Sequence, residues 1–370
     1  MIPVNTPLLK GNEKKYLNEC IDSGWISSEG PFVKRFEDDF SKYIGMSHGI
    51  AVSNGSAALD IAVRALNLEE GSEVIVPTFT IISPIQSIYN EKLVPVLIDS
   101  DPNTWNMHVN QIEPKITAKT KAILIVHIYG LPVDVQPILD LAKKYNLKII
   151  EDAAEMHGQT YNGKKCGSFG DISIFSFYPN KHITTGEGGM VLTNNNELAE
   201  RCRQLRNLCF IAERRFVHRE IGWNYRMTNM QAALGVAQLE QIDYIIERKR
   251  HIGHRYQDNL KYIKGLQLPL DSTLYSENIY WVFGMVAESE DLSLTIQKRL
   301  NSHKIGTRPF FWCMHEQPVF NSKGLFLGES YPNAERMARN GFYIPSGLGL
   351  SDSEIDEVSE HLLKAADNNG

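Results

Sequence analysis

The chain has 370 residues and a formal net charge of −6, with 42% hydrophobic and 22% charged residues. Its length favours two or three domains with a large core, and the acidic balance argues against nucleic acid or an anionic membrane as a partner. No apolar run approaches the roughly 18 residues of a membrane span, and the start lacks a signal-peptide core, so we expect a cytoplasmic protein.

Strand and helix alternate through the first two thirds of the chain. Short apolar runs typical of buried strands are separated by helical patterns such as residues 136–145. The predicted strands are residues 49–52, 73–76, 93–98, 121–127, 148–151, 171–177 and 190–193. This alternation predicts an α/β fold with a mainly parallel seven-stranded sheet flanked by helices.

The last third is predicted to form a smaller α+β domain. Its expected elements are a strand at 279–286, a helix at 292–300, a strand near Arg308 and a final helix beginning at Ser351, where Ser351 and Glu354 form a capping box. We place the large domain at residues 1–250 and the small one at 251–370. The charged stretch 247–251 is interpreted as a solvated helix face.

Three predicted strand ends carry residues that suit one cofactor. Lys181 follows an apolar strand, where poor solvation favours a neutral amine that can attack a carbonyl. Asp152 ends another strand, and a carboxylate there can keep the ring nitrogen of pyridoxal phosphate protonated. Gly55 and Ser56 open a helix whose free N–H groups suit a phosphate. Because parallel sheets bind ligands at the carboxyl ends of their strands, the sequence predicts a pyridoxal phosphate site.

Each of these features also has a simpler interpretation. Lys181 can be a solvated loop residue, and Asp152 can be a helix cap. Gly55 and Ser56 can form an ordinary turn between a strand and a helix. The coincidence of all three at strand ends favours the cofactor site.

The cysteines and histidines do not predict a metal site. The cysteines are five in number and scattered, so we expect them to be reduced and structural. They are Cys20, Cys166, Cys202, Cys209 and Cys313. His251 and His254 form a close pair without a third ligand nearby, and we therefore expect no catalytic metal.

Several longer motifs give the chain a family resemblance from about Pro3 to the final helix. The motifs are residues 25–30 (WISSEG), 53–56 (SNGS), 73–77 (EVIVP), 127–130 (HIYG), 151–155 (EDAAE), 176–189 (SFYPNKHITTGEGG) and 224–229 (NYRMTN). With them the chain resembles the aminotransferases of nucleotide-linked sugars, within the fold type I pyridoxal phosphate superfamily. Relatives that replace the lysine by histidine are dehydratases, and Lys181 excludes that group.

The resemblance assigns roles around the cofactor ring. It implies that Lys181 forms the Schiff base, that Asp152 binds the pyridine nitrogen and that Glu155 lies near the ring hydroxyl. Ile81 stands where the family usually stacks an aromatic ring on the cofactor, which costs about 0.5–1.5 kcal/mol of stacking. Phe79, two residues away, is not expected to replace that ring.

The resemblance also assigns the phosphate and implies a dimer. Gly55, Ser56, Ala57 and Ser176 would hold the cofactor phosphate. Asn224 would reach the phosphate of the neighbouring subunit, so the expected assembly is a homodimer with shared active sites.

Residues on the substrate side are implied as well. Trp25 belongs to the first motif. The segment 308–312 (RPFFW), which begins with Arg308, and His315 are expected on the sugar or pyrophosphate side, with a structural role as the alternative for Arg308 and for His315. Arg226 is a candidate for the donor carboxylate or the sugar diphosphate, because guanidinium binds both in a bidentate way. Its alternative is an ion pair in the dimer interface.

The resemblance implies L-glutamate as amino donor and a nucleotide-linked 4-keto-6-deoxyhexose as acceptor. Segment 183–189 matches enzymes that aminate carbon 4 and not carbon 3. The motifs favour GDP-4-keto-6-deoxymannose, and a dTDP- or UDP-linked sugar of the viosamine type is the alternative. The implied destination of the amino sugar is O-antigen and lipopolysaccharide biosynthesis.

Two other classes of protein remain open on the sequence alone. A regulator that binds pyridoxal or a sugar nucleotide without catalysis would more often lack Lys181. A pyridoxal lyase or decarboxylase would share Lys181 and Asp152 but would not need the sugar-enzyme motifs.

Overall fold

A seven-stranded sheet forms the centre of the larger part of the molecule. The computed structural model describes residues 1–211 and 214–367. The strands are β1 (His48–Val52), β2 (Glu73–Pro77), β3 (Val94–Ile98), β4 (Thr120–Val126), β5 (Lys148–Asp152), β8 (Ile172–Ser176) and β9 (Gly189–Thr193). Their order is β1-β9-β8-β5-β4-β2-β3, and β9 runs opposite to the direction that the other six strands share. The predicted α/β fold and its sheet are confirmed.

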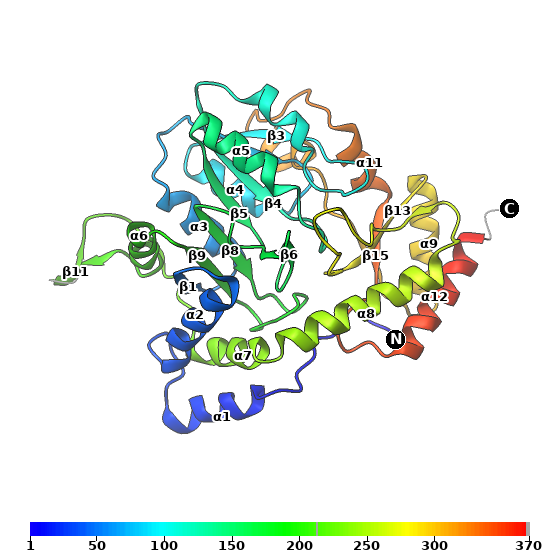
Figure 1. Ribbon diagram of the computed structural model, residues 1–370, viewed down its shortest axis with the longest axis horizontal. Coiled ribbons are helices and arrows are strands. Elements are labelled where there is room, and N and C mark those ends of the chain that lie inside the picture. Colours follow the sequence, from blue (N-terminus) through cyan, green and yellow to red (C-terminus); the bar gives the residue numbers. More distant parts are fainter. Residues whose placement is uncertain (212–213, 368–370) are drawn as a thin grey trace.

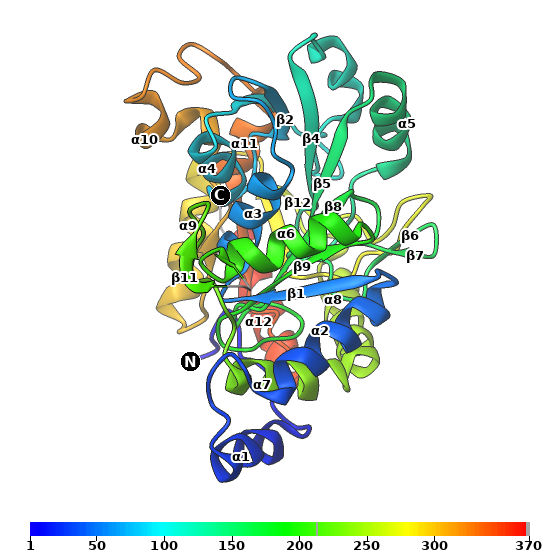
Figure 2. The same cartoon turned by 90° about the vertical axis from the view of Figure 1, so that its left-hand side faces the viewer.

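Helices cover both faces of this sheet (Figures 1 and 2). Strand side chains alternate between the faces. Val74 and Val76 therefore pack in the core beneath α3, α4 and α6, whereas Ile75 packs in the core beneath α2, α5 and α7. The helices of this part are α1 (Glu13–Ser23), α2 (Pro31–Ile44), α3 (Gly55–Ala65), α4 (Ser83–Asn90), α5 (Val135–Tyr145), α6 (Asn196–Arg206) and α7 (Asn229–Leu239).

A second, antiparallel sheet lies in the C-terminal part. Its order is β12-β13-β15-β14, with strands β12 (Leu266–Gln267), β13 (Phe283–Ala287), β14 (Arg308–Pro309) and β15 (Gly341–Ile344). The helices of this part are α8 (Ile242–Leu260), α9 (Glu290–Ser302), α10 (Pro318–Asn321), α11 (Pro332–Asn340) and α12 (Asp352–Asp367). A separate hydrophobic cluster is built from α8, α9, α12, β12, β13 and β15, with Ile2 of the N-terminal segment. Residues of α10 and α11 pack instead in a core of the large sheet.

The long helix α8 joins the two parts and passes through the predicted domain boundary at 250/251 (Figure 1). Trp281 and Phe310, from beyond that boundary, pack in the core of the large sheet. The division into two domains stays a prediction. The capping box at the start of α12 is confirmed, because Glu354 N donates to Ser351 Oγ and Ser351 N donates to Glu354 Oε2.

Two predictions about the C-terminal part are wrong in detail. The strand predicted at 279–286 begins only at Phe283, because Tyr280 has a left-handed φ of 50° and its amide donates to Asn278 Oδ1. The stretch 247–251 is not wholly solvated. Lys249 faces inward and is only 4% exposed.

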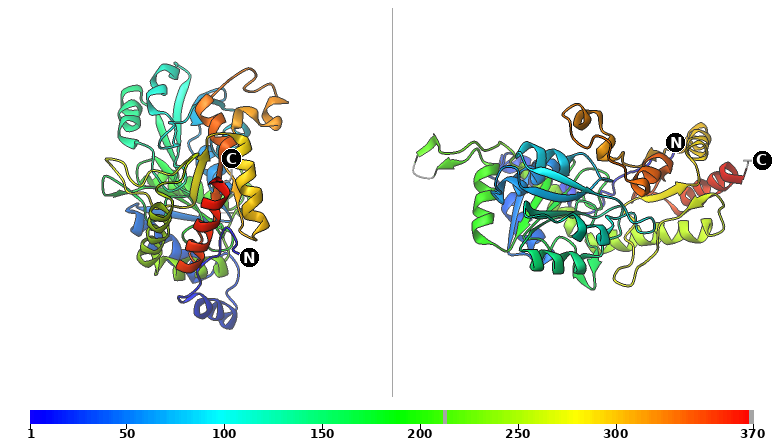
Figure 3. Two further views of the ribbon diagram at one scale, coloured as in Figure 1. Left: turned by 90° about the vertical axis from the view of Figure 1, so that its right-hand side faces the viewer. Right: turned by 90° about the horizontal axis from the view of Figure 1, so that it is seen from above.

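Short irregular elements complete the chain. They are the hairpins β6–β7 (Thr160–Tyr161, Lys164–Lys165) and β10–β11 (Phe210–Ile211, Arg214–His218), and the 3-10 turns η1 (Val109–Gln111), η2 (Glu113–Lys115) and η3 (Met314–Glu316). The hairpin β10–β11 projects far from the body of the molecule (Figure 3). Phe216 at this hairpin is 81% exposed, which leaves an apolar side chain without cover in the single chain.

Within the described residues no helix is both long and apolar enough to cross a membrane.

Candidate active site

The carboxyl ends of β1, β5 and β8 converge on a chamber of about 540 Å³. Among its lining residues are seven that were predicted for the site: Gly55, Ser56, Ile81, Asp152, Glu155, Ser176 and Lys181. A methyl group at Gly55 would lie 2.8 Å from Ser176 Cβ, so the start of α3 can meet the end of β8 only through a glycine. The sheet thus brings together residues that are more than a hundred positions apart.

Lys181 points its amine into this chamber. Its side chain is 9% exposed, and Nζ lies 3.6 Å from Glu155 Oε1. Burial lowers the pKa of the amine, while the nearby carboxylates of Glu155 and Asp152 raise it. A solvated loop lysine would not show this environment, so the simpler interpretation of Lys181 is wrong.

Two buried carboxyl groups face the amine. Burial raises the pKa of Asp152 to about 6 and that of Glu155 to about 7. Asp152 accepts a hydrogen bond from Ala154 N, but a turn and not a helix follows β5. Asp152 is therefore not a helix cap, and its carboxylate is free to meet a cationic partner in the chamber.

The first turn of α3 borders the chamber with backbone donors. Gly55 and Ser56 occupy first-turn positions, whose amides have no acceptor within the helix. The Ala57 amide differs, because it donates to the Asn54 side chain at 2.8 Å. Ser56 Oγ lies 2.7 Å from Ser83 Oγ, which adds hydroxyl donors at the same place. An anion at this helix end would meet amides, hydroxyls and the positive end of the helix dipole.

The chamber has the donor set that pyridoxal phosphate requires. It presents an amine for the carbonyl, a carboxylate for the ring nitrogen and a helix end for the phosphate. Thr80 Oγ1 also belongs to the chamber lining, is buried and has no hydrogen-bond partner among the described residues. These residues fit the cofactor.

Ile81 lies at the chamber wall and is 51% exposed. Phe79 is fully buried, in contact with the rings of Tyr129, Phe310 and Phe311. It therefore cannot supply the aromatic face that Ile81 lacks.

Six residues predicted for the site do not line the chamber of their own chain. They are Ala57, whose amide is described above, Trp25, Asn224, Arg226, His315 and, beside the chamber, Arg308. Asn224 is exposed and pairs with Asn207, and Trp25 is half-exposed. His315 is buried between Thr78 Oγ1 and Glu335 Oε1, at 2.8 and 3.1 Å from its ring nitrogens. This placement favours the structural alternative for His315.

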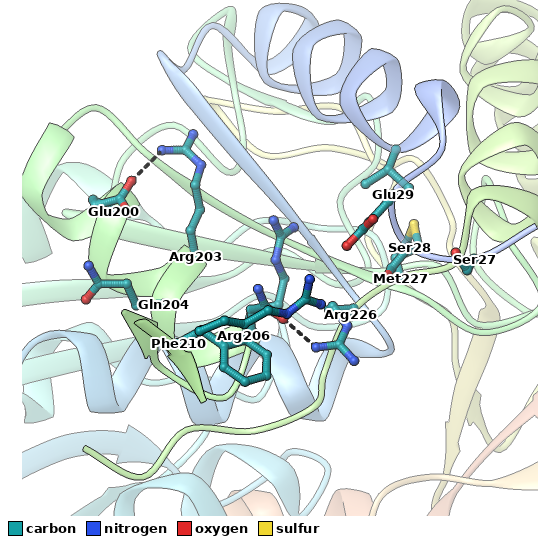
Figure 4. A pocket seen from close by; sticks show the side chains of 13 residues that line it. Ser27, Ser28, Glu29, Glu200, Arg203, Gln204, Arg206, Phe210, Arg226 and Met227 are labelled. Atoms are coloured by element: carbon teal, nitrogen blue, oxygen red, sulfur yellow. Dashed lines mark hydrogen bonds and ion pairs between the residues drawn. The ribbon is translucent and has the colours of Figure 1, made fainter. Parts of the chain in front are cut away.

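Arg226 lines a different, polar cavity of about 560 Å³ (Figure 4). Its guanidinium donates to Asn207 Oδ1. Arg203, Arg206 and Arg215 line the same cavity, opposite Ser27 to Glu29 of the first motif. The cavity therefore concentrates positive charge away from the chamber of the same chain.

Arg308 lines a cavity of about 600 Å³ beside the chamber. The two cavities share Tyr178, Asn180, Trp281 and Tyr343 as a common wall. Arg308 is exposed and its backbone pairs with Tyr343, while its guanidinium makes no hydrogen bond or ion pair with the described residues.

Sequence reasoning missed several chamber residues. They are His127, Tyr178, Asn180, Glu187, Trp281, Phe311 and Tyr343. His127, Tyr178, Asn180 and Glu187 lie inside or beside quoted motifs and could have been found there. Trp281 and Tyr343 come from the C-terminal part, where no motif marks them and only the fold brings them to the chamber. Phe311 lies in the segment 308–312 that was expected on the substrate side, but it was not predicted as a site residue itself.

Two side-chain clusters contain metal-ligand atoms within the described residues: His127 with Glu151 and Cys166, and His315 with Glu316 and Glu335. In the first, Glu151 accepts hydrogen bonds from His127 and from backbone amides, so protein donors already satisfy it. All five cysteines are buried and free of disulfides. The expectation that the enzyme uses no metal stays a prediction.

Comparison with known sequences decides the family. The profile of the DegT/DnrJ/EryC1/StrS aminotransferase family matches residues 7–363. The chain belongs to this family. It is therefore an aminotransferase, and its cofactor is pyridoxal phosphate.

Relatives in the family match along the whole chain. GDP-perosamine synthase of Escherichia coli O157:H7 is 42% identical over 98% of this chain and 97% of its own. GDP-perosamine synthase of Vibrio cholerae is 40% identical over 97% of each chain. The dTDP-3-amino-3,6-dideoxy-alpha-D-galactopyranose transaminase of Aneurinibacillus thermoaerophilus is 36% identical over 93% of this chain and 92% of its own. These similarities extend over both parts of the fold.

A solved structure agrees with the fold. DesV of S. venezuelae, determined in complex with a ketimine intermediate, superposes with a TM-score of 0.90 at 30% identity. The match covers 97% of this chain and 95% of DesV.

Proposed function

We propose that the enzyme transfers the amino group of L-glutamate to carbon 4 of a nucleotide-linked 4-keto-6-deoxyhexose, with GDP-4-keto-6-deoxymannose as substrate and GDP-perosamine as product. The observation that carries the proposal is the full-length similarity to two GDP-perosamine synthases, combined with a chamber that holds Lys181, Asp152 and Glu155. The overall exchange is balanced, since the ketone gains the amine that glutamate loses as it becomes 2-oxoglutarate.

Each chamber residue then has a task. Lys181 binds the cofactor carbonyl and, when released, moves the proton at the reacting carbon, which requires a pKa near the working pH. Burial lowers the pKa of this amine in the required direction. Asp152 holds the proton on the ring nitrogen, and Glu155 lies beside the amine. When bound, pyridoxal phosphate supplies the electron sink that makes that proton mobile.

The positions of the lining residues also suggest which of them bind the cofactor phosphate and which bind the substrate. We assign Gly55, Ser56 and Ser176 to the cofactor phosphate, with Ala57 reaching it only if its bond to Asn54 opens. Arg308 is assigned to the diphosphate side, because an unpaired guanidinium beside the chamber suits an anion.

We also propose that the working unit is a homodimer with shared sites. Among the described residues that line the chamber, Asp152, Glu155 and Glu187 carry carboxylates, whereas Lys181 is the one ammonium or guanidinium group. The proposed ligands are anionic: a phosphate, the carboxylates of glutamate and a sugar diphosphate. Arg308 of the same chain suits one of these anions, and the cavity around Arg226 offers further cations in a second copy. Asn224 and Trp25 would belong to that partner-facing surface.

The second candidate function is amination of a sugar that carries a different nucleotide, or amination at a different carbon of the sugar ring. The relative that is a dTDP-3-amino-sugar transaminase keeps this alternative open. A cytoplasmic location, and O-antigen of lipopolysaccharide as the destination of the product, accompany the proposal as predictions.

Parallel assays distinguish the candidates. The purified enzyme with pyridoxal phosphate and L-glutamate is given GDP-mannose plus its 4,6-dehydratase, or dTDP-glucose plus its own dehydratase. Product masses identify the nucleotide and NMR identifies the aminated carbon. We expect a GDP-linked 4-amino sugar. Amination of the dTDP-linked sugar alone, or at carbon 3, would contradict the proposal.

A further inference from the structure

Trp281 contacts the catalytic lysine in two ways. The Lys181 amine lies over the indole ring, 3.8 Å from its centroid. The indole Nε1 donates to the carbonyl of Asn180, the residue just before Lys181, at 2.8 Å. Trp281 is only 4% exposed, so neither contact competes with bulk water. One side chain thus holds both the charged end of Lys181 and the backbone that carries it.

The backbone of Trp281 is itself anchored. Lys249 from α8 donates to the carbonyls of Trp281 at 2.9 Å and Ser346 at 2.6 Å. A methyl group at Gly130 would lie 2.6 Å from Trp281 N, so this backbone has no room to shift toward Gly130. The buried lysine that contradicted the prediction of a solvated helix face therefore fixes the tryptophan in place.

The ionisable groups around Lys181 do not make a tight ion pair. Glu155 lies 3.6 Å from Nζ, and its own pKa is raised to about 7 by burial. Asp152 lies farther along the chamber wall. Burial lowers the pKa values of the nearby His157 and His182, which disfavours a positive charge on either ring. The carboxylates of Glu155 and Asp152 favour a protonated amine. The indole face of Trp281 adds a second attraction, because an indole attracts cations more strongly than other aromatic rings.

We propose that Trp281 is a positioning residue of the aminotransferase reaction, whose indole face holds the Lys181 amine during the part of the cycle in which that amine is not bonded to the cofactor. The proposal rests on the proposed function of Lys181. The indole keeps the free amine beside Glu155 and directed into the chamber, ready to return a proton or to rebind the cofactor. The hydrogen bond from Nε1 to the Asn180 carbonyl holds the loop that carries Lys181 in place while the amine binds to or leaves the cofactor.

The test measures the pKa of Lys181 in the cofactor-free protein. Trace acetylation with acetic anhydride across a pH series, read by peptide mass spectrometry, reports the neutral fraction of each lysine. In Trp281→Leu the ammonium loses the π-face, so we expect the Lys181 pKa to fall by about one unit. Trp281→Phe keeps a weaker π-face and should shift it less. If Trp281→Leu does not fold, the change in the Lys181 pKa between the wild type and Trp281→Phe tests the proposal instead.

Trp105→Leu is the matched control. Trp105 is also buried, at 3% exposed, but its ring contacts Tyr129 and Phe310 and not Lys181. This variant should lose stability and leave the Lys181 pKa unchanged. An unchanged Lys181 pKa in both Trp281 variants would overturn the inference. A wild-type protein without transaminase activity would instead overturn the proposed function, because the acetylation measurement needs neither cofactor nor substrate.

Discussion

The environment of Lys181 combines burial with nearby carboxylates, and these act on its amine in opposite directions. Burial disfavours the ammonium, whereas Glu155 and Asp152 favour it. The result is an amine that can change protonation state without leaving the chamber. This is the property that a single group needs when it serves as both base and acid.

Lys181→Ala should abolish transamination while the fold stays intact, because we propose the amine as both tether and proton carrier. Lys181→Arg should not restore activity, since a guanidinium stays protonated. Turnover and circular dichroism of the two variants check this expectation. Transamination at the wild-type rate in Lys181→Ala would contradict the assignment of this residue.

Asp152 gives a prediction about pH. Its folded pKa of about 6 lies above the ordinary 3.8, so the folded protein binds the proton more tightly than the unfolded chain. Stability of the cofactor-free protein should therefore fall as the pH rises through this window. Asp152→Asn cannot titrate, and the wild type should lose on the order of 2 kcal/mol more than the variant between pH 4.5 and 7.

Urea unfolding of the wild type and of Asp152→Asn at the two pH values measures this difference in unfolding free energy. Glu155 titrates in both proteins and serves as an internal control. Turnover of Asp152→Asn should fall by orders of magnitude, because the ring nitrogen loses its counter-charge. Equal pH slopes in the two proteins, together with nearly normal turnover, would show that Asp152 is neither buried as described nor a ligand of the ring.

At the scale of elements, the strands could be predicted because each is a short apolar run followed by a polar turn. All seven predicted strands of the large sheet form within a residue or two of their predicted bounds. The errors lie where a single contact overrides the local pattern. Asn278 turns the chain at Tyr280 before β13 begins, and Lys249 finds two backbone carbonyls in a stretch whose composition favoured solvent.

The capping box of α12 gives a stability prediction that is independent of catalysis. Ser351→Ala removes the acceptor for Glu354 N, which should cost about 0.5–2 kcal/mol of unfolding free energy. Activity at 25 °C should not change, because α12 does not line the chamber. Glu357→Ala, at an exposed position of the same helix and away from the cap, is the control and should have little effect. Equal losses in both variants would mean that the cap does not stabilise the helix.

At the scale of the whole molecule, the chamber residues that directly follow a strand could be predicted from the sequence. Those that come from distant parts of the chain could not. Gly55, Asp152 and Lys181 could be predicted because a strand end marks each of them. Trp281 and Tyr343 could not, because only the packing of the C-terminal part against the large sheet brings them to the chamber. Asn224 and Arg226 lie outside their own chamber, and their proposed role depends on a second copy.

Shared sites make a prediction about mixed dimers. A two-fold interface exchanges the same residues in both directions, so a dimer of Asn224→Ala and Lys181→Ala chains has one site with both defects and one with neither. After equal mixing and subunit exchange, about a quarter of all sites should be intact. Activity should then rise above that of either parent variant. Mixed dimers that form, as shown by native mass spectrometry, but stay at the level of the Asn224→Ala parent would contradict the shared site.

In the proposed function, Lys181 and pyridoxal phosphate carry an amino group from L-glutamate to a keto sugar nucleotide. Absorbance of the cofactor-loaded protein through one complete cycle is the decisive measurement. We expect a yellow protein that bleaches with L-glutamate and regains its colour when GDP-4-keto-6-deoxymannose is added, with one amino sugar formed per site. A protein that bleaches with glutamate but never regains colour with any keto sugar nucleotide, or that releases carbon dioxide from the amino acid, would contradict the proposed function.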